Sequence, residues 1–196
     1  MMKIVVFNGA PKSGKDTFGS LLKQDLNGLE DCLAENHSFK EIMFDILCNL
    51  FSITHSEWFD RYDKAKEEPW DKLRGLSQRQ ALIALSEQGL KNAFGQDIFG
   101  YHMVGRLKFA SAGIDEAGYK YYAVFTDCGF QEELDCLKAE FGAENIMLVR
   151  LHREGFDFSN DSRSLLYDSE VHSIDVDSKG LGETYDKIWE EFRKWD

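Results

Sequence analysis

Residues 9–17 constrain the fold of this chain most strongly, because they form a glycine-rich turn between an apolar strand and an apolar-periodic helix. The turn contains the G-x-x-x-x-G-K core of a phosphate-binding loop, in the order Gly9-Ala10-Pro11-Lys12-Ser13-Gly14-Lys15-Asp16-Thr17. Apolar residues recur at helical spacing after it, namely Phe18, Leu21, Leu22 and Leu26. Inward-turned backbone N–H groups and the positive end of the helix dipole would cradle an anion there.

Each residue of the loop has an expected role in nucleotide binding. Lys15 would reach the β- and γ-phosphates and act in catalysis. Asp16 stands where Ser or Thr usually ligates Mg²⁺, so we expect it to hold the metal directly or through water, with Thr17 on a phosphate. The alternative is a first-turn acid that favours the helix dipole. The predicted nucleotide contacts within the loop are Gly9, Lys12, Ser13, Gly14, Lys15, Asp16 and Thr17.

Strands alternate with helices along the chain, which predicts a parallel sheet covered on both faces. We expect an α/β fold of three layers, the P-loop NTPase fold, with about five parallel strands flanked by helices. The predicted strands are Lys3 to Asn8, Cys32 to Phe39, Tyr119 to Thr126, Asn145 to Leu151 and His172 to Val176. The predicted helices begin at Lys15 and cover Lys40 to Phe51, Ser77 to Phe94, Asp97 to Ala110, 130–141 and 185–195.

The remaining segments are expected to be connections within a single domain of 196 residues. Residues 52–76 would be a long connection with helical pieces, and residues 111–118 a surface loop. Together with the helices between them, they predict a helical, acceptor-binding insert over about 40–118. A second connection, about 152–170, is polar and rich in Ser, as mobile lids are. A solvated surface loop with scattered arginines is the alternative.

Asp127 is the second candidate acid. It follows an apolar strand, as the Mg²⁺-holding carboxylate of a P-loop enzyme does, so it is a predicted catalytic residue and, with Asp16, a predicted metal ligand. Capping of the next helix is a compatible alternative. Because ligands of parallel sheets bind at the carboxyl ends of strands, Asn8, Asp127 and Arg150 should line one crevice.

Phosphoryl transfer needs positive charge opposite the transferred group. Arg150 is the predicted catalytic cation, Arg153 a predicted nucleotide contact and Arg163 a predicted substrate contact; all three flank or lie in the lid segment. The other candidates for substrate binding are Lys40, Arg61, Arg79, Gln131 and Glu133. A surface salt bridge explains Arg79 almost as well, and Gln80 suits a capping box with Ser77 better than a substrate contact.

Composition excludes several classes of function. The net charge of −12 and a pI of about 4.9 argue against nucleic-acid binding. No Cys or His spacing suggests zinc, and reduced thiols are expected for the four cysteines. No stretch approaches the ~20 apolar residues of a membrane span, and the N-terminal residues do not form a signal peptide. We therefore expect a cytoplasmic protein, with a homodimer left open.

With these residues in place, the chain resembles the deoxynucleoside monophosphate kinases of tailed phages, which belong to the P-loop kinases. The resemblance rests on Ser13-Gly14-Lys15-Asp16-Thr17 and, less specifically, on segments over most of the chain. These segments are the helix of Arg79 leading to Phe94-Gly95-Gln96-Asp97, Thr126-Asp127, the helix of Glu133, Val149-Arg150 and Asn160-Asp161-Ser162. The chain departs from the family at Gly129, where Arg is usual, and at Arg163 to Leu166.

The resemblance implies ATP and Mg²⁺ as cofactors, a deoxynucleoside monophosphate as substrate, and a place in deoxynucleotide metabolism. Two other hypotheses stay open. The chain could be a P-loop kinase of another small molecule, or a nucleotide-binding regulatory protein without an acceptor. Nothing in the sequence matches the N-K-x-D signature of guanine-nucleotide switches.

Overall fold

The computed structural model describes residues 2–159 and 161–196, without the side chains of Asp63, Asp115 and Glu116. Asn160, part of the expected lid, lies outside the described residues. The chain forms two compact units, one from the residues up to 38 together with 100–196, the other from residues 39–99. Where we expected an insert over about 40–118, the helical unit covers 39–99, and residues 100–118 belong to the α/β unit.

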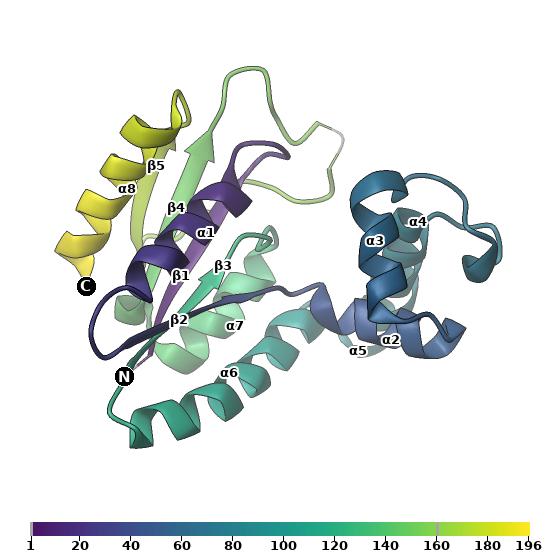
Figure 1. Cartoon of the computed structure of the whole chain (residues 1–196), viewed down its shortest axis with the longest axis horizontal. Helices are drawn as coiled ribbons and strands as arrows, with labels where there is room; N and C mark the ends of the chain where they lie inside the picture. The colour runs from purple at the N-terminus through teal and green to yellow at the C-terminus, as the bar shows by residue number, and fades with distance from the viewer. Residues whose placement is uncertain (1, 160) are drawn as a thin grey trace. The chain divides into compact units, whose positions relative to one another are not determined.

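The α/β unit is built on a parallel sheet of five strands (Figure 1), and the predicted fold class is confirmed. The strands follow the order β2-β3-β1-β4-β5, and every neighbouring pair is parallel. Their bounds are β1 Met2–Gly9, β2 Cys32–His37, β3 Lys120–Phe125, β4 Ile146–His152 and β5 His172–Asp177. Since all strands run the same way, the loops after them meet at one edge of the sheet.

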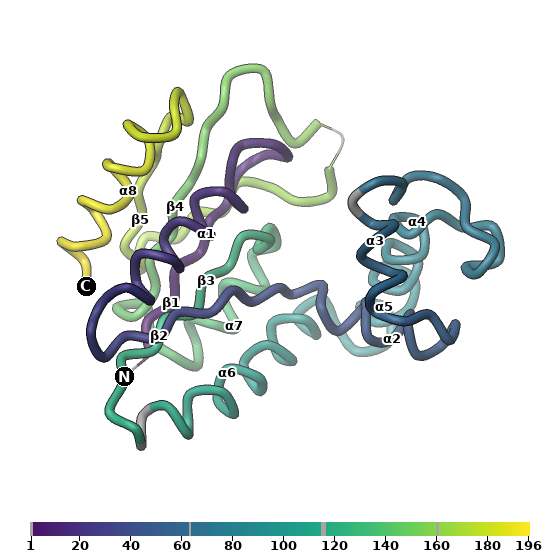
Figure 2. Tube along the Cα trace, viewed as in Figure 1, coloured from purple at the N-terminus to yellow at the C-terminus, as the bar shows by residue number. Residues whose placement is uncertain are grey.

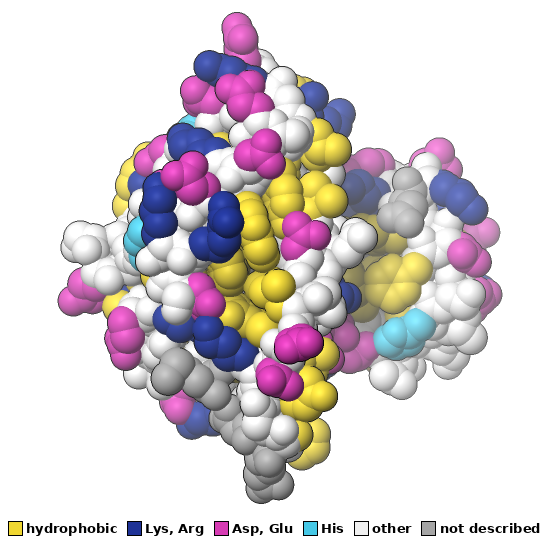
Figure 3. All heavy atoms as spheres, turned by 60° about the vertical axis from the view of Figure 1, so that its left-hand side comes forward, with side chains coloured by type: hydrophobic (Ala, Val, Ile, Leu, Met, Phe, Trp, Pro, Cys, Tyr) yellow, Lys and Arg dark blue, Asp and Glu magenta, His cyan; other side chains and the backbone are white. Residues whose placement is uncertain are grey.

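Helices cover both faces of this sheet. Helices α1 (Lys15–Leu26) and α8 (Leu181–Trp195) lie on one face, and α6 (Ile98–Glu116) and α7 (Gln131–Phe141) on the other (Figure 1). Under α1 and α8, a core of apolar side chains combines residues of all five strands with Leu22 of α1 and Phe192 of α8. On the side of α8, exposed hydrophobic side chains form a strip bordered by charged ones (Figure 3). The buried strands explain the near-continuous apolar runs of the sequence.

The helical unit packs around aromatic side chains. Its helices are α2 (Glu41–Phe51), α3 (His55–Ala65), α4 (Gln78–Ile83) and α5 (Lys91–Phe94), with a π-helical stretch over Ala84–Leu90 between the last two. Trp58 is fully buried there and lies 5.7 Å from Phe44 between ring centroids. Capping boxes begin α3 at Thr54 and α4 at Ser77, the second as predicted from Gln80.

One expected connection is wrong. We expected residues 111–118 to form a surface loop because of Gly113 and Gly118, but α6 continues to Glu116. Gly113 lies within the helix, where a glycine is tolerated at a cost of roughly 1 kcal/mol relative to alanine. The chain leaves the helix only near Gly118, whose φ of 81° few other residues adopt. In this segment, helix continuation outweighed a single glycine.

Leu134 of α7 and Leu29 after α1 differ in burial, so substitutions at the two positions test how much burial against the sheet stabilises the fold. Leu134 is fully buried and Leu29 is 48% exposed. We expect Leu134→Ala to lower the free energy of unfolding by about 2–5 kcal/mol, through lost burial and a residual cavity. Leu29→Ala removes the same atoms from a half-exposed site, so its loss should be under about 1 kcal/mol. Urea unfolding of both variants measures this, and equal losses would contradict the packing described.

Candidate nucleotide site

In the loop between β1 and α1, the side chain of Lys15 bonds back to the start of the loop. Lys12 and Gly14 have positive φ of 65° and 102°, which turns the chain sharply before α1. The Nζ of Lys15 donates to the carbonyl oxygens of Gly9 at 2.7 Å and Ala10 at 2.8 Å, and the side chain is buried. Ser13 Oγ is also buried and has no hydrogen-bond partner. A buried ammonium inside a glycine-rich turn is the arrangement that anion binding requires.

Two carboxylates lie beside this loop at the carboxyl edge of the sheet. Asp16 Oδ1 accepts a hydrogen bond from Thr126 Oγ1 at 2.7 Å. Asp127, the next residue after Thr126, is buried, and its Oδ2 accepts from Ser38 Oγ at 2.6 Å. Of the two residues directly after β3, Thr126 thus contacts one predicted metal-binding acid, and Asp127 is the other. Sequence reasoning missed Ser38 and Thr126, because single hydroxyls carry no pattern.

Asn8 ties the end of β1 to two loops. Its Nδ2 donates to the carbonyl oxygens of Cys128 and Ser164, each at 3.1 Å, while its Oδ1 accepts from the N–H of Leu166 at 3.0 Å. The side chain is 1% exposed. Figure 2 shows the path of the expected lid from the end of β4 back to β5. The bonds to Asn8 hold residues 164–166 of this segment against the turn after β3.

Arg163 lies directly on Gly129. A Cβ at Gly129 would come within 2.5 Å of the Arg163 Cγ and Cδ atoms, so only glycine fits under this side chain. The guanidinium of Arg163 donates to both carboxylate oxygens of Asp161, at 2.8 and 2.6 Å. Asp161 is the main reason that the pKa of Arg163 is raised, and the charges of Asp127 and Glu133 add to it. Arg163 therefore lies on the turn that begins at Asp127.

Arg150 is held by the neighbouring strand. Its Nε and Nη2 donate to the two carboxylate oxygens of Asp175 on β5, at 2.9 and 2.6 Å, and its guanidinium stacks on the Tyr167 ring. His152 also contacts Asp175, at 2.6 Å. The hydrogen bond from Arg150 is the main cause that lowers the pKa of Asp175 to about 2. In this structure the predicted catalytic cation is thus the partner of a carboxylate that sequence reasoning missed.

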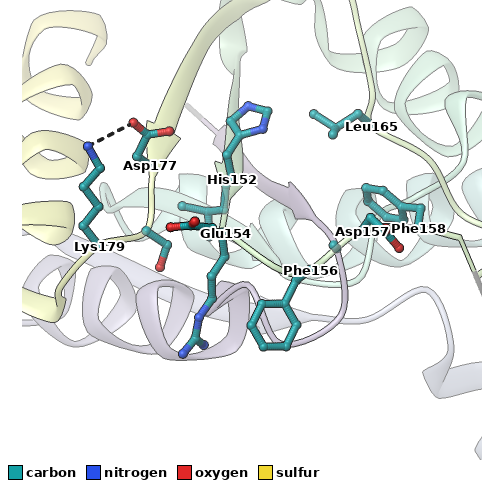
Figure 4. A pocket seen from close by; sticks show the side chains of 12 residues that line it. His152, Glu154, Phe156, Asp157, Phe158, Leu165, Asp177 and Lys179 are labelled. Atoms are coloured by element: carbon teal, nitrogen blue, oxygen red, sulfur yellow. Dashed lines mark ion pairs between the residues drawn. The ribbon is translucent and has the colours of Figure 1, made fainter.

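Arg153 lies at the phosphate-binding loop, next to a pocket of about 730 Å³. Its Nη1 donates to the Lys12 carbonyl oxygen at 2.7 Å, and its guanidinium lies 4.9 Å from the centre of the Phe156 ring. Figure 4 shows the pocket with Asp177 and Lys179 on one side and Leu165 and Phe158 on the other. Apolar rings beside an anion-binding turn suit a flat base attached to phosphates. Sequence reasoning missed these rings, because the lid segment was judged by its polar residues.

The side chains of Arg61 and Arg79, two predicted substrate contacts on the helical unit, have partners within that unit. Arg61 Nη2 donates to the carbonyl oxygen of Pro69 at 2.9 Å, and its guanidinium lies over Trp70. Arg79 is half-exposed and lies 3.6 Å from Glu67, the salt bridge that was the alternative for this residue. Lys40 immediately precedes α2, and its carbonyl oxygen accepts from the N–H of Met43 at 2.9 Å.

The two remaining candidates lie at the start of α7. Glu133 is buried, and its Oε2 accepts from the N–H groups of Gly129 at 3.1 Å and Phe130 at 3.3 Å. This carboxylate therefore caps the helix and holds the turn on which the Arg163 side chain lies. Gln131 Nε2 donates to Asp135 on the helix surface at 2.9 Å.

No protein-family model matches this sequence, and a search of curated proteins finds no relative. Solved structures with a similar fold include a gluconokinase from Sinorhizobium meliloti 1021, with 12% identity, a TM-score of 0.45, and coverage of 98% of this chain and 92% of that one. A hexameric APS kinase from Thiobacillus denitrificans has 13% identity and a TM-score of 0.49, over 99% of this chain and 29% of that one. A sugar kinase from Janibacter sp. HTCC2649 has 13% identity and a TM-score of 0.44, over 100% of this chain and 94% of that one. Similarities this low carry no information on substrate.

Two classes of feature are not found in the part of the chain that the structure describes. Within residues 2–159 and 161–196, no helix combines the length and hydropathy of a membrane span. The same residues contain no group of three or more His, Cys, Asp or Glu side chains placed to hold a metal.

The pair of Arg150 and Asp175 predicts a pH-dependent contribution to stability. Because the folded-state pKa of Asp175 lies at about 2, below the ordinary 3.8, the pair stabilises the fold above about pH 4 and loses this contribution as the pH falls through 2. In Arg150→Met we expect the pKa of Asp175 to return toward 3.8. The stability deficit of this variant should therefore shrink between pH 4 and pH 2, by about 1 kcal/mol or less for so exposed a carboxylate.

Urea unfolding at pH 7, 4 and 2.5 measures that deficit. Arg153→Met is the matched control, because its guanidinium donates to a backbone carbonyl that does not titrate. A deficit of Arg150→Met that stays constant over this range would contradict the assignment.

Proposed function

We propose that this chain binds ATP and transfers its γ-phosphoryl group to a nucleoside monophosphate. The observation that carries the proposal is the loop after β1, in which the ammonium of Lys15 is buried within a glycine-rich turn at the start of a helix. Such a turn offers backbone N–H groups, a positive helix end and a fixed cation to the same anion. The pocket lined by Arg153 and Phe156 adjoins this turn at Ala10, where a base attached to the phosphates can lie.

Lys15 would change partners when a nucleotide binds. Its ammonium now donates to two loop carbonyls, and a phosphate oxygen would replace at least one of these acceptors. During transfer, the same ammonium would stabilise the charge that develops on the phosphoryl oxygens. Arg153 would hold the base and the loop together, since it contacts both Lys12 and Phe156.

Asp16 and Asp127 fit the binding of Mg²⁺. Mg²⁺ usually takes one or two protein carboxylates and completes its octahedron with water and substrate phosphates. Asp16, exposed in the first turn of α1, and Asp127, buried directly after β3, match this need. When bound, the ion would neutralise phosphate charge, while Ser38 and Thr126 orient the two carboxylates through their hydroxyl groups.

The acceptor class rests on the resemblance to nucleoside monophosphate kinases and on charge. Arg163 lies on Gly129, two residues after Asp127, so it can pair with an acceptor phosphate at the edge of the sheet where the loop of Lys15 lies. Arg150 is held by Asp175, and we assign it the role of shaping the site. Arg163 is paired with Asp161 in the same way, so an acceptor phosphate would have to replace that carboxylate.

A coupled assay of ADP release across the common nucleoside and deoxynucleoside monophosphates tests the acceptor. We expect ADP formation with ATP and Mg²⁺ to depend on at least one of these acceptors. ADP release no faster than with ATP alone, for every acceptor in the panel, would remove the nucleoside monophosphate from the proposal.

Lys15→Ala tests the loop itself. Losing a preorganised charge contact to the transferred group commonly lowers the turnover number by about 10²–10³-fold, and we expect a loss of that size. Lys23→Ala is the control, because Lys23 lies in the last turn of the same helix and should leave turnover unchanged. Thermal unfolding of both variants separates a catalytic effect from loss of the fold. Unchanged turnover in Lys15→Ala would refute the assignment.

A further inference from the structure

A second pocket, of about 500 Å³, lies on the α/β unit between β2 and one side of α6. Strand β2 is an edge strand of the sheet. It contributes Glu35 and His37 to the lining. Helix α6 contributes the rest of the lining, namely Tyr101, His102, Gly105, Arg106, Phe109 and Ala110. None of these residues belongs to the nucleotide site described above, so this pocket is separate from that site.

The helix side of this pocket has the form of a slot between two rings. Tyr101, Gly105 and Phe109 follow one another at intervals of four residues and therefore lie on one face of α6. The two aromatic residues are unusually exposed, at 74% and 89%. Between them Gly105 has no side chain, and a Cβ built on it meets nothing within 4 Å. Eight residues of helix separate the Cα atoms of Tyr101 and Phe109 by about 12 Å along the axis, which leaves room for a planar ring above Gly105.

The strand side of the pocket is a fixed polar network. Tyr121 of β3 donates its hydroxyl hydrogen to Glu35 Oε2 at 2.8 Å. Because a phenol has a single hydrogen, the 2.6 Å contact between Tyr121 and His37 requires the Nε2–H of His37 to donate to the phenol oxygen. Glu35 thus supplies acceptor atoms at the pocket, and Arg106 supplies donors. The rings and Arg106 of α6, together with Glu35 of β2, are the elements that bind a nucleobase, by stacking and by hydrogen bonds to its edge.

One lining residue of the pocket is next in the sequence to a residue at the proposed site of transfer. His37 ends β2, and the next residue, Ser38, donates to Asp127. We propose that the slot of Tyr101, Gly105 and Phe109 binds the nucleobase of the phosphoryl acceptor, so that its phosphate points toward the end of β3. This inference rests on the proposed function for the role of the bound molecule, while binding of the base itself is measurable without turnover.

Filling the slot tests this proposal. Gly105→Leu places a side chain between the two rings without a steric conflict, because the position is open and leucine is a good helix former. Gly113→Leu is the matched control, since Gly113 lies in the same helix, is equally open and does not line the pocket. Calorimetric titration with unphosphorylated nucleosides measures binding, with a non-hydrolysable ATP analogue present at saturation to fill the site beside Lys15.

We expect at least one nucleoside to bind the wild type and Gly113→Leu equally, and Gly105→Leu at least about tenfold more weakly, because stacking on aromatic rings supplies much of such binding. Equal affinity for all three proteins, or no nucleoside binding to the wild type, would overturn the slot. In the ADP-release assay, Gly105→Leu should raise the KM for the acceptor about tenfold and leave the KM for ATP unchanged. Transfer with an unchanged acceptor KM would overturn the slot and leave the proposed function standing. If Gly105→Leu loses nucleoside binding but the wild type transfers no phosphoryl group, the slot stands as a nucleoside site and the proposed function falls.

Discussion

The side chain of Asn8 organises the carboxyl edge of the sheet. Asn8 is the last residue but one of the central strand β1, directly before Gly9, and it bonds to Cys128, Ser164 and Leu166. Each of these bonds is buried or partly buried, so none can be exchanged for water without cost. The positions of the turn after β3 and of residues 164–166 in the expected lid therefore depend on one amide group. Asp127, Gly129 and Arg163 are all placed by these two segments.

Charge at this edge is balanced locally, although the chain has a net charge of −12. Arg150 pairs with Asp175, and Arg163 pairs with Asp161. Lys15 and Arg153 instead donate to backbone carbonyls, which are weaker partners than carboxylates. An incoming phosphate displaces such partners more easily than it displaces an ion pair. If the proposed nucleotide binds here, the partners of Lys15 and Arg153 are therefore easier to replace than those of Arg150 and Arg163.

Much of the α/β fold was predictable, because its signals are local. All five strands lie where apolar runs predicted them, to within one or two residues, and the glycine-rich turn stands between β1 and α1. The capping box at Ser77 was predicted for the same reason, since its two partners are three residues apart. The helical conformation of residues 111–116 was not predicted. A glycine favours the end of a helix while its neighbours favour continuation, and only packing decides between the two.

Contacts between side chains that are far apart in the sequence could not be predicted from the sequence. Arg150 was expected to face a phosphate and is held by Asp175, 25 residues away. Sequence separation does not explain Glu133, a predicted substrate contact that accepts from N–H groups only three and four residues away. Gly129 marked a departure from the resembling family, and its reason becomes visible only when Arg163 lies on it. What the sequence alone determined is the order of strands and helices and the anion-binding turn, since these follow from periodicity and backbone freedom. Which charges face that turn was decided by the tertiary structure, because ion pairs form between residues that only the folded sheet brings together.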